Sequence, residues 1–208
     1  LIAVLIAGTL SAQTTYPPVG GDQIRTETYL IPAPTSGPMS PTWSSDGEWI
    51  AFSMWGSIWR VSVGGGVAEE LTSGPGYDYQ PSYSPEGSRI VFTRERNKQL
   101  DIWELAGNER QITNDKAVDL VPSYTLEGEI IFYSSRSGNF DIWQAPDEQL
   151  TMEPSRDMQP SYSPIEPTIA FVSGRESPVG TGGIWKKDLR SGETSLVYFE
   201  ETVYRTRP

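Results

Sequence analysis

Pairs of arginine and aspartate recur along this chain, and their spacing points most clearly to a shared chemical role. An arginine stands four positions after the phenylalanine of three apolar segments, and an aspartate stands three positions before three prolines. The six residues are Arg96, Arg136, Arg175, Asp78, Asp119 and Asp157. A guanidinium can hold a carboxylate through two parallel hydrogen bonds. The pairs therefore suit either a structural clamp or the recognition of a partner.

The chain of 208 residues contains no histidine and no cysteine. Imidazole is the usual general base and the commonest metal ligand, and thiolate is the other strong nucleophile and ligand. Without them, these residues cannot build a Ser-His-Asp or Cys-His arrangement or a thiolate metal site. We therefore expect no catalytic residue within the sequence.

Other features that suggest chemistry have simpler structural explanations. The three glycines at 64–66 lack the lysine and hydroxyl residue of a phosphate loop and predict a hairpin turn. The carboxylates of Glu69-Glu70 and Glu200-Glu201 point to opposite faces of a strand. Asp101 and Asn139 could offer oxygen atoms to Ca²⁺, but their spacing matches no known calcium loop. The sequence predicts no metal site and no cofactor.

Charge and the N-terminal residues bear on partners and location. The formal net charge is -11, from acidic residues scattered along the chain, whereas nucleic-acid binding needs clustered lysine and arginine. Residues 1–10 are almost wholly apolar but too short to span a bilayer. We interpret residues 1–12 as a signal peptide remnant, with a buried strand as the alternative, and residues 13–40 as an extended segment. Because the chain starts at Leu1 without a basic leader, we expect the true N-terminus to lie upstream and the protein to be periplasmic or secreted.

One short sequence motif occurs four times along the chain. It begins with Pro-Thr-Trp or Pro-Ser-Tyr at Pro41, Pro81, Pro122 and Pro160, in steps of 40, 41 and 38 residues. Each copy continues with an apolar segment that contains a phenylalanine and then reaches an Ile-Trp dipeptide. The four tryptophans of this dipeptide are Trp59, Trp103, Trp143 and Trp185. Repeats in one register should meet equivalent neighbours, so we expect these indoles to be largely buried on the third strand of each unit.

Each copy reads as four short strands separated by turns, and no segment reads as a long amphipathic helix. A period near 40 residues with four strands per repeat is typical of a β-propeller blade. The sequence predicts an all-β fold of four-stranded antiparallel blades. The blades are expected near residues 41–80, 81–121, 122–159 and 160–207.

The repeated Pro-x-Trp/Tyr-Ser-x-Asp/Glu-Gly phrase, followed by Ile-x-Phe-x-Ser and Ile-Trp, resembles the TolB-like propeller repeat over residues 41–208. Leu71-Thr72 and Ile112-Thr113 add to the resemblance. Such propellers usually close with six blades, so the resemblance implies that the four copies here are part of a truncated ring. The fourth copy departs from the pattern, with Ile165-Glu166-Pro167 in place of Asp-Gly. Residues 46–87 also look like the propeller that precedes the catalytic barrel of secreted amidohydrolases, and similar blades precede the catalytic domain of prolyl-oligopeptidase-type peptidases.

Two functions remain open. The first is a non-catalytic module outside the cytoplasm that binds a protein or gates access to one. The second is the accessory part of a larger hydrolase whose catalytic domain lies beyond Pro208. A metal-dependent amidohydrolase is favoured over a serine peptidase. The partner is accordingly another protein or the chain's own C-terminal domain, with no membrane span.

The Arg–Asp pairs are expected on the face opposite the Glu-Gly turns, together with the variable loops 94–100 and 174–183. For these pairs, a structural role in which the guanidinium holds the carboxylate and fixes the rim of the blade is favoured over ligand binding. The first copy carries Gly56 and Pro38 where the others carry arginine and aspartate, so both partners are missing together.

Overall fold

The computed structural model describes residues 37–175 and 182–199, so the proposed signal peptide and most of the extended segment lie outside the described residues. Sixteen strands form four separate four-stranded antiparallel sheets, each made of consecutive strands. The all-β fold of antiparallel blades is confirmed. Within these ranges, no helix is long and apolar enough to cross a membrane.

The strands of the first two sheets precede residue 112. The first sheet contains β1 (Met39–Trp43), β2 (Trp49–Met54), β3 (Ser57–Ser62) and β4 (Glu69–Glu70). The second sheet contains β5 (Tyr77–Tyr83), β6 (Ile90–Arg96), β7 (Gln99–Ala106) and β8 (Asn108–Gln111).

The strands of the last two sheets follow the same order. The third sheet contains β9 (Asp119–Tyr124), β10 (Ile130–Ser134), β11 (Asp141–Gln144) and β12 (Glu148–Gln149). The fourth sheet contains β13 (Asp157–Tyr162), β14 (Thr168–Ser173), β15 (Gly183–Asp188) and β16 (Thr194–Phe199). In each sheet the first strand begins two to four residues before the repeated proline.

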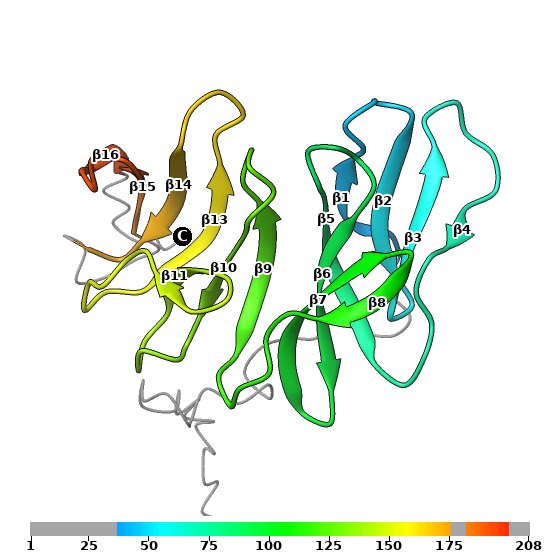
Figure 1. The fold of residues 1–208 in the computed structure, drawn as a ribbon, viewed down its shortest axis with the longest axis horizontal. Coiled ribbons are helices and arrows are strands. Elements are labelled where there is room, and N and C mark those ends of the chain that lie inside the picture. The colour runs from blue at the N-terminus through cyan, green and yellow to red at the C-terminus, as the bar shows by residue number, and fades with distance from the viewer. Residues whose placement is uncertain (1–36, 176–181, 200–208) are drawn as a thin grey trace, which may run out of the picture.

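The four sheets stand in a row, side by side. Their first strands, β1, β5, β9 and β13, contact one another in that order and are therefore the inner strands of a propeller. The fourth strands form the outer edge. The first and fourth sheets lie at opposite ends of the row (Figure 1), so the described residues form an open arc and not a closed four-bladed ring.

The residue before each repeated proline has a positive φ. Ser40, Gln80, Val121 and Gln159 have φ values of 51°, 57°, 51° and 55°, and the pairing of each inner strand with its neighbour slips at this point. Proline has no N–H to give to a ladder, so a β-bulge is the place where a strand can accept it. The repeated proline thus marks a bulge in the inner strand of all four sheets.

The Ile-Trp tryptophans occupy equivalent positions, as the sequence predicted. Each one lies opposite the phenylalanine of the second strand. These cross-strand pairs are Phe52 with Trp59, Phe92 with Trp103, Phe132 with Trp143 and Phe171 with Trp185. Trp185 is buried and the other three are half-buried. None is free in solvent.

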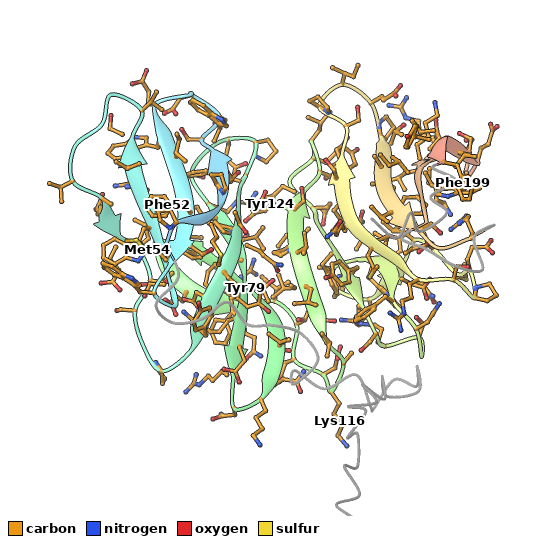
Figure 2. All side chains as sticks on the ribbon, turned by 180° about the vertical axis from the view of Figure 1, so that it is seen from behind. Phe52, Met54, Tyr79, Lys116, Tyr124 and Phe199 are labelled. Atoms are coloured by element: carbon orange, nitrogen blue, oxygen red, sulfur yellow. The ribbon has the colours of Figure 1, made fainter. Side chains whose placement is uncertain are left out.

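Apolar side chains fill the space between neighbouring sheets. Three buried clusters join the first sheet to the second, the second to the third, and the third to the fourth. Tyr124, for example, lies between the two middle sheets (Figure 2) and is packed with Ile102 of the preceding one. Because a single sheet has no closed core, each blade depends on its neighbours for burial.

A threonine ties the outer part of the first three sheets to the third strand. The hydroxyl groups of Thr72, Thr113 and Thr151 accept hydrogen bonds of 2.9–3.0 Å from the backbone N–H of the Ile-Trp isoleucine. All three threonines belong to a Leu-Thr or Ile-Thr dipeptide, the third being Leu150-Thr151. Their role is to hold the short fourth strand in place.

The first turn of the fourth sheet differs from the others, as its sequence suggests. The other three sheets use a glycine with φ between 73° and 83°. In the fourth, Thr168 N–H donates to the Glu166 carbonyl at 2.7 Å, so the turn is closed without a glycine.

Candidate interaction face

The third and fourth sheets carry the same arginine clamp. Nη2 of Arg136 donates to Asp119 at 2.9 Å, its Nε donates to the Ser134 hydroxyl at 3.0 Å, and its guanidinium lies 4.9 Å from the centre of the Trp143 ring. In the fourth sheet, Arg175 makes the corresponding bonds to Asp157 at 2.6 Å and Ser173 at 2.9 Å, and stacks on Trp185 at 4.9 Å. The two pairs proposed from spacing are therefore present. Their arginines lie just after β10 and β14, and their aspartates begin β9 and β13.

In the second sheet the arginine of the pair was predicted wrongly. Asp78 accepts two hydrogen bonds, of 2.5 and 2.7 Å, from Arg94 and not from Arg96, whose side chain is exposed. Arg94 stacks on the same aromatic positions, 4.7 Å from Trp103 and 5.2 Å from Phe92. It stands two residues after the phenylalanine, where the third and fourth sheets have the clamp serine, Ser134 or Ser173.

The length of the hairpin explains this difference. The strands β6 and β7 run to a two-residue turn at Asn97 and Lys98, both with positive φ, as a type I′ turn requires. Arg96 therefore lies at the tip of a long hairpin. In the third and fourth sheets the second strand ends earlier, at Ser134 and Ser173, and the arginine two residues beyond its end reaches the same place. The Asn97 turn and Arg94 at the serine position were the signals available in the sequence.

The first sheet has neither partner of the clamp, as expected from Gly56 and Pro38. Trp55, from the turn between β2 and β3, lies edge-on to Trp59 with ring centroids 6.0 Å apart. An indole therefore stands near the tryptophan that an arginine covers in the other sheets. Trp55 remains 61% exposed.

The aspartates of the clamps are buried. Burial raises the pKa of Asp119 even though the Arg136 guanidinium and neighbouring hydroxyl groups favour the charged form. Asp157 shows the same balance, with burial raising its pKa against the Ser173 hydrogen bond and Arg175. Oδ1 of Asp119 and Oδ1 of Asp157 have no hydrogen-bond partner among the described residues. The clamp thus compensates a buried charge, which is a structural task.

Two further carboxylates lie beside the clamps, and sequence reasoning missed this role. Asp101 is the third residue of β7 and Asp141 is the first residue of β11, and both are buried. Burial, followed by the charges of Asp119 and Asp115, raises the pKa of Asp101 to about 7. Burial, opposed by the Ser137 hydrogen bond, also raises the pKa of Asp141. Carboxylates from neighbouring sheets therefore share this face.

The clamps, together with the loops between the second and third strands, define what we call the arginine face. Its members are Arg94, Arg136, Arg175, Asp78, Asp119 and Asp157 with the loop residues 55–56, 97–98 and 135–140. Whether this face binds a partner stays a prediction. Among the described residues, no group of three or more histidine, cysteine or acidic side chains is arranged to hold a metal ion.

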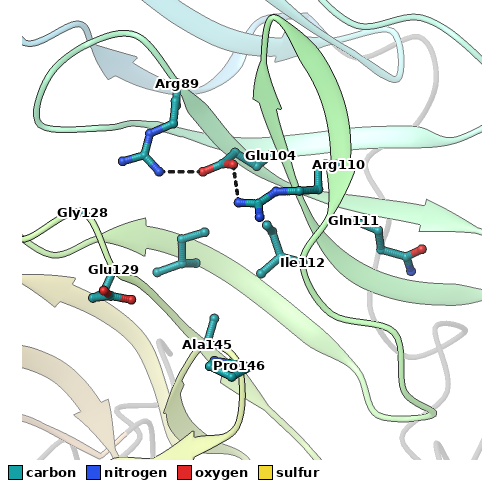
Figure 3. A pocket seen from close by; sticks show the side chains of 10 residues that line it. Arg89, Glu104, Arg110, Gln111, Ile112, Gly128, Glu129, Ala145 and Pro146 are labelled. Carbon is teal, nitrogen blue, oxygen red and sulfur yellow. Dashed lines mark hydrogen bonds and ion pairs between the residues drawn. The ribbon is translucent and has the colours of Figure 1, made fainter.

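The opposite face, which carries the Glu-Gly turns, has a pocket of about 360 Å³ between the second and third sheets (Figure 3). The buried carboxylate of Glu104 accepts hydrogen bonds from Arg89 at 3.0 Å, Arg110 at 2.8 Å and Tyr124 at 2.8 Å. Burial disfavours the charged form of Glu104, but the bonds from Arg110 and Tyr124 outweigh it and lower its pKa. The Glu104 carboxylate is held by side chains of both sheets, so this arrangement joins two blades.

Comparison with known proteins gives consistent results. A "Protein TolB homolog" of Chlorobium luteolum is 31% identical over 144 residues, which cover 66% of this chain and 32% of the relative. A "Tol-Pal system protein TolB" of Francisella tularensis subsp. holarctica is 23% identical over 170 residues, covering 74% and 39%. The chain therefore spans about a third of the length of these relatives.

A solved structure of TolB from Acinetobacter baumannii superposes with a TM-score of 0.70 at 25% identity, covering 78% of this chain and 44% of that one. The family described as the TolB beta propeller domain matches residues 26–148, which is more than half of the chain. This chain belongs to the TolB beta propeller domain family.

Proposed function

We propose that this chain is a non-catalytic protein-interaction module that acts outside the cytoplasm and binds its partner through the arginine face. The observation that carries the proposal is the contrast between framework and loops. The clamps fix the ends of the second strands in three sheets, while the loops that they support differ in length and sequence. Variable loops on a rigid scaffold are the usual place for recognition.

Two further points support the proposal. Relatives of this chain are named as TolB of a Tol-Pal system, which places them in an assembly of proteins. The apolar residues 1–10 have the composition of an export signal, which supports a periplasmic or secreted location.

Site-specific photo-crosslinking tests the proposal. A photoreactive amino acid replaces Lys98, an exposed residue of the arginine face, and in a matched variant replaces Leu126, an exposed residue beside the Glu127-Gly128 turn on the opposite face. We expect crosslinks to a protein in cells from position 98 and none from position 126. Crosslinks from position 126 alone, or from neither position, would contradict the proposed face.

In its finer form, we propose that the module is the N-terminal accessory part of a larger hydrolase, with a metal-dependent amidohydrolase favoured over a serine peptidase. The resemblance of residues 46–87 to amidohydrolase propellers supports this. The gene downstream of residue 208 tests it: a barrel with a His-x-His segment would support an amidohydrolase, and a Gly-x-Ser-x-Gly segment a peptidase. Two more blades and a stop codon would contradict both and leave the interaction module alone.

A further inference from the structure

The hairpin between β6 and β7 ends in a turn with an unusual residue at its second central position. Asn97 and Lys98 form this two-residue turn, with φ values of 56° and 66°. In the first sheet, the two-residue turn between β2 and β3 is formed by Trp55 and Gly56, with φ values of 55° and 83°. Lys98 therefore holds the position at which the first sheet has a glycine.

A lysine at this position costs stability. A positive φ brings Cβ close to a backbone carbonyl oxygen, so glycine is strongly preferred there in a type I′ turn. The loops that follow β10 and β14 also place a glycine at positive φ, Gly138 at 102° and Gly182 at 85°. The Lys98 side chain is exposed and makes no hydrogen bond or ion pair within the described residues, so no contact there offsets the strain. A strained residue without a packing role points to a task outside the fold.

Lys98 belongs to a group of exposed cations that have no counter-ion. Arg96, Lys98 and Lys116 are all exposed, and none of them forms an ion pair in the part of the chain that the structure describes. The side chain of Gln99 donates a hydrogen bond to the Ala117 carbonyl, which joins the hairpin to the loop that carries Lys116. Lys116 lies near the start of β9 and points away from the sheets (Figure 2). We call these three cations the basic tip. By contrast, six other arginines are ion-paired: Arg60, Arg89, Arg94, Arg110, Arg136 and Arg175.

The acidic residues next to the basic tip in the sequence are already engaged. Oε1 of Glu95 accepts the backbone N–H of Lys98 at 2.6 Å, and Oδ2 of Asp115 lies 2.9 Å from Nη2 of Arg136. The whole chain has a formal net charge of -11, so the basic tip is a local reversal of sign. The turns of the opposite face carry exposed carboxylates instead: Asp46, Glu48, Glu86, Glu127, Glu129 and Glu166.

We propose that the basic tip binds an acidic segment of the partner protein, through the carboxylates of its aspartate or glutamate side chains. The inference rests on the proposed function and names the chemistry of the partner. Complementary charge selects a partner and speeds its encounter. Three cations match a short segment with a few carboxylates. A membrane surface or a nucleic acid would extend beyond the tip and meet the excess of acidic residues around it.

The test uses the 208-residue chain and a fluorescein-labelled peptide of alternating glutamate and serine, with a peptide of alternating glutamine and serine as the uncharged counterpart. Fluorescence anisotropy at low and physiological salt measures binding, and urea denaturation measures stability. The variants are Lys98→Gly, which removes both charge and strain, and Lys98→Arg, which keeps both. Arg190→Ala is the matched control, because Arg190 is an exposed cation in the turn between β15 and β16, on the opposite face.

We expect the glutamate peptide to bind in a salt-dependent way and the glutamine peptide not to bind. Lys98→Gly should weaken binding by about two- to fivefold, the usual contribution of an exposed ion pair, and should raise the urea midpoint. Lys98→Arg should keep both the affinity and the midpoint, and Arg190→Ala should keep the affinity. A lysine with a merely structural role could not lose binding while the fold gains stability.

Equal binding of the two peptides, unchanged affinity of Lys98→Gly, or a lower urea midpoint for this variant would overturn the proposal. Binding to phosphatidylglycerol vesicles without binding to the glutamate peptide would assign the basic tip to a membrane and overturn an acidic segment. Photo-crosslinking from position 98 keeps the two levels apart. Crosslinks to a protein without affinity for the glutamate peptide would refute this inference and leave the proposed function standing, whereas peptide binding without crosslinks would refute the proposed function.

Discussion

A guanidinium reaches one and the same place in three sheets, above a phenylalanine and a tryptophan and beside a buried aspartate, from two different positions in the sequence. Arg94 does so from within a strand, and Arg136 and Arg175 do so from the loop after one. The length of the arginine side chain permits both routes. The position of the charge is therefore kept although its attachment to the backbone is not.

Replacing Arg94 tests this clamp against the arginine that spacing alone had indicated. Arg94→Ala leaves the Asp78 carboxylate buried without its counter-ion, which should lower the free energy of unfolding by about 3–5 kcal/mol. Arg96→Ala removes an exposed side chain and should change it by less than about 0.5 kcal/mol. Urea denaturation measures both. Equal losses would show that Arg94 and Arg96 share the role.

Asp101 predicts a pH dependence. Its pKa is about 7 in the folded chain against 3.8 for an ordinary aspartate, so the folded state keeps the proton after the unfolded state has lost it. This contribution to stability is fully present below about pH 4 and is lost as the pH rises to 7. Asp101→Asn should therefore be more stable than the unmodified chain by about 1–3 kcal/mol at pH 8 and gain much less at pH 4.5.

Urea denaturation of the unmodified chain and Asp101→Asn at pH 4.5 and 8 measures this difference. Because the comparison is between two chains at each pH, the other carboxylates cancel. A stability difference that does not change with pH would show that Asp101 is ionised throughout.

At the scale of the strands, the register of the third strand rests on the tryptophans. Trp103 lies opposite Phe92, packs beside the first sheet and lies under Arg94. Trp103→Ala should cost roughly 3–5 kcal/mol of unfolding free energy. Trp55→Ala, at an exposed turn, should cost less than about 1 kcal/mol. Thermal or urea denaturation of the two variants measures these losses of stability. A loss for Trp55→Ala as large as that for Trp103→Ala would argue against this register.

The strands were predictable from sequence because four copies of one pattern reinforce one another. The proline, the phenylalanine and the Ile-Trp dipeptide fall in the same places in every sheet, and this was enough for the fold class and the equivalence of the tryptophans. The Arg136 and Arg175 clamps were also predictable, because the segments Ser134–Arg136 and Ser173–Arg175 make the same hydrogen bonds. The Arg94 clamp was not, since it depends on how far β6 and β7 run before they turn. The raised pKa of Asp101 was not predictable, because the neighbouring charge of Asp119 comes from the next sheet.

At the scale of the molecule, stability should vary along the row. The third sheet has neighbours on both sides, and all five residues of β10 are buried, whereas β16 lies at the open end with three exposed residues in its centre. Units that contact only their neighbours tend to open from the ends. Hydrogen exchange followed by mass spectrometry should find the slowest amides in β10 and faster exchange in β16. Uniform protection across the four sheets would indicate a single cooperative unit.

The 208-residue chain should show no hydrolytic activity of its own. The 208 residues contain no imidazole or thiolate to activate water or to hold an open zinc site. The purified chain should hydrolyse neither amide nor peptide substrates, with or without added Zn²⁺. Metal-dependent turnover that follows the chain through purification would refute this.

The bulge before each proline also bears on misassembly. The inner strand of every sheet has one free edge, and a free edge offers N–H and C=O groups on which a strand from another molecule can add. In all four sheets the inner strand is kinked here by a residue with positive φ, which is followed by a proline without an N–H. Such an edge is a poor template for amyloid-like growth. The repeat thereby leaves its faces free to pack while blocking the edges that would otherwise recruit unfolded chains.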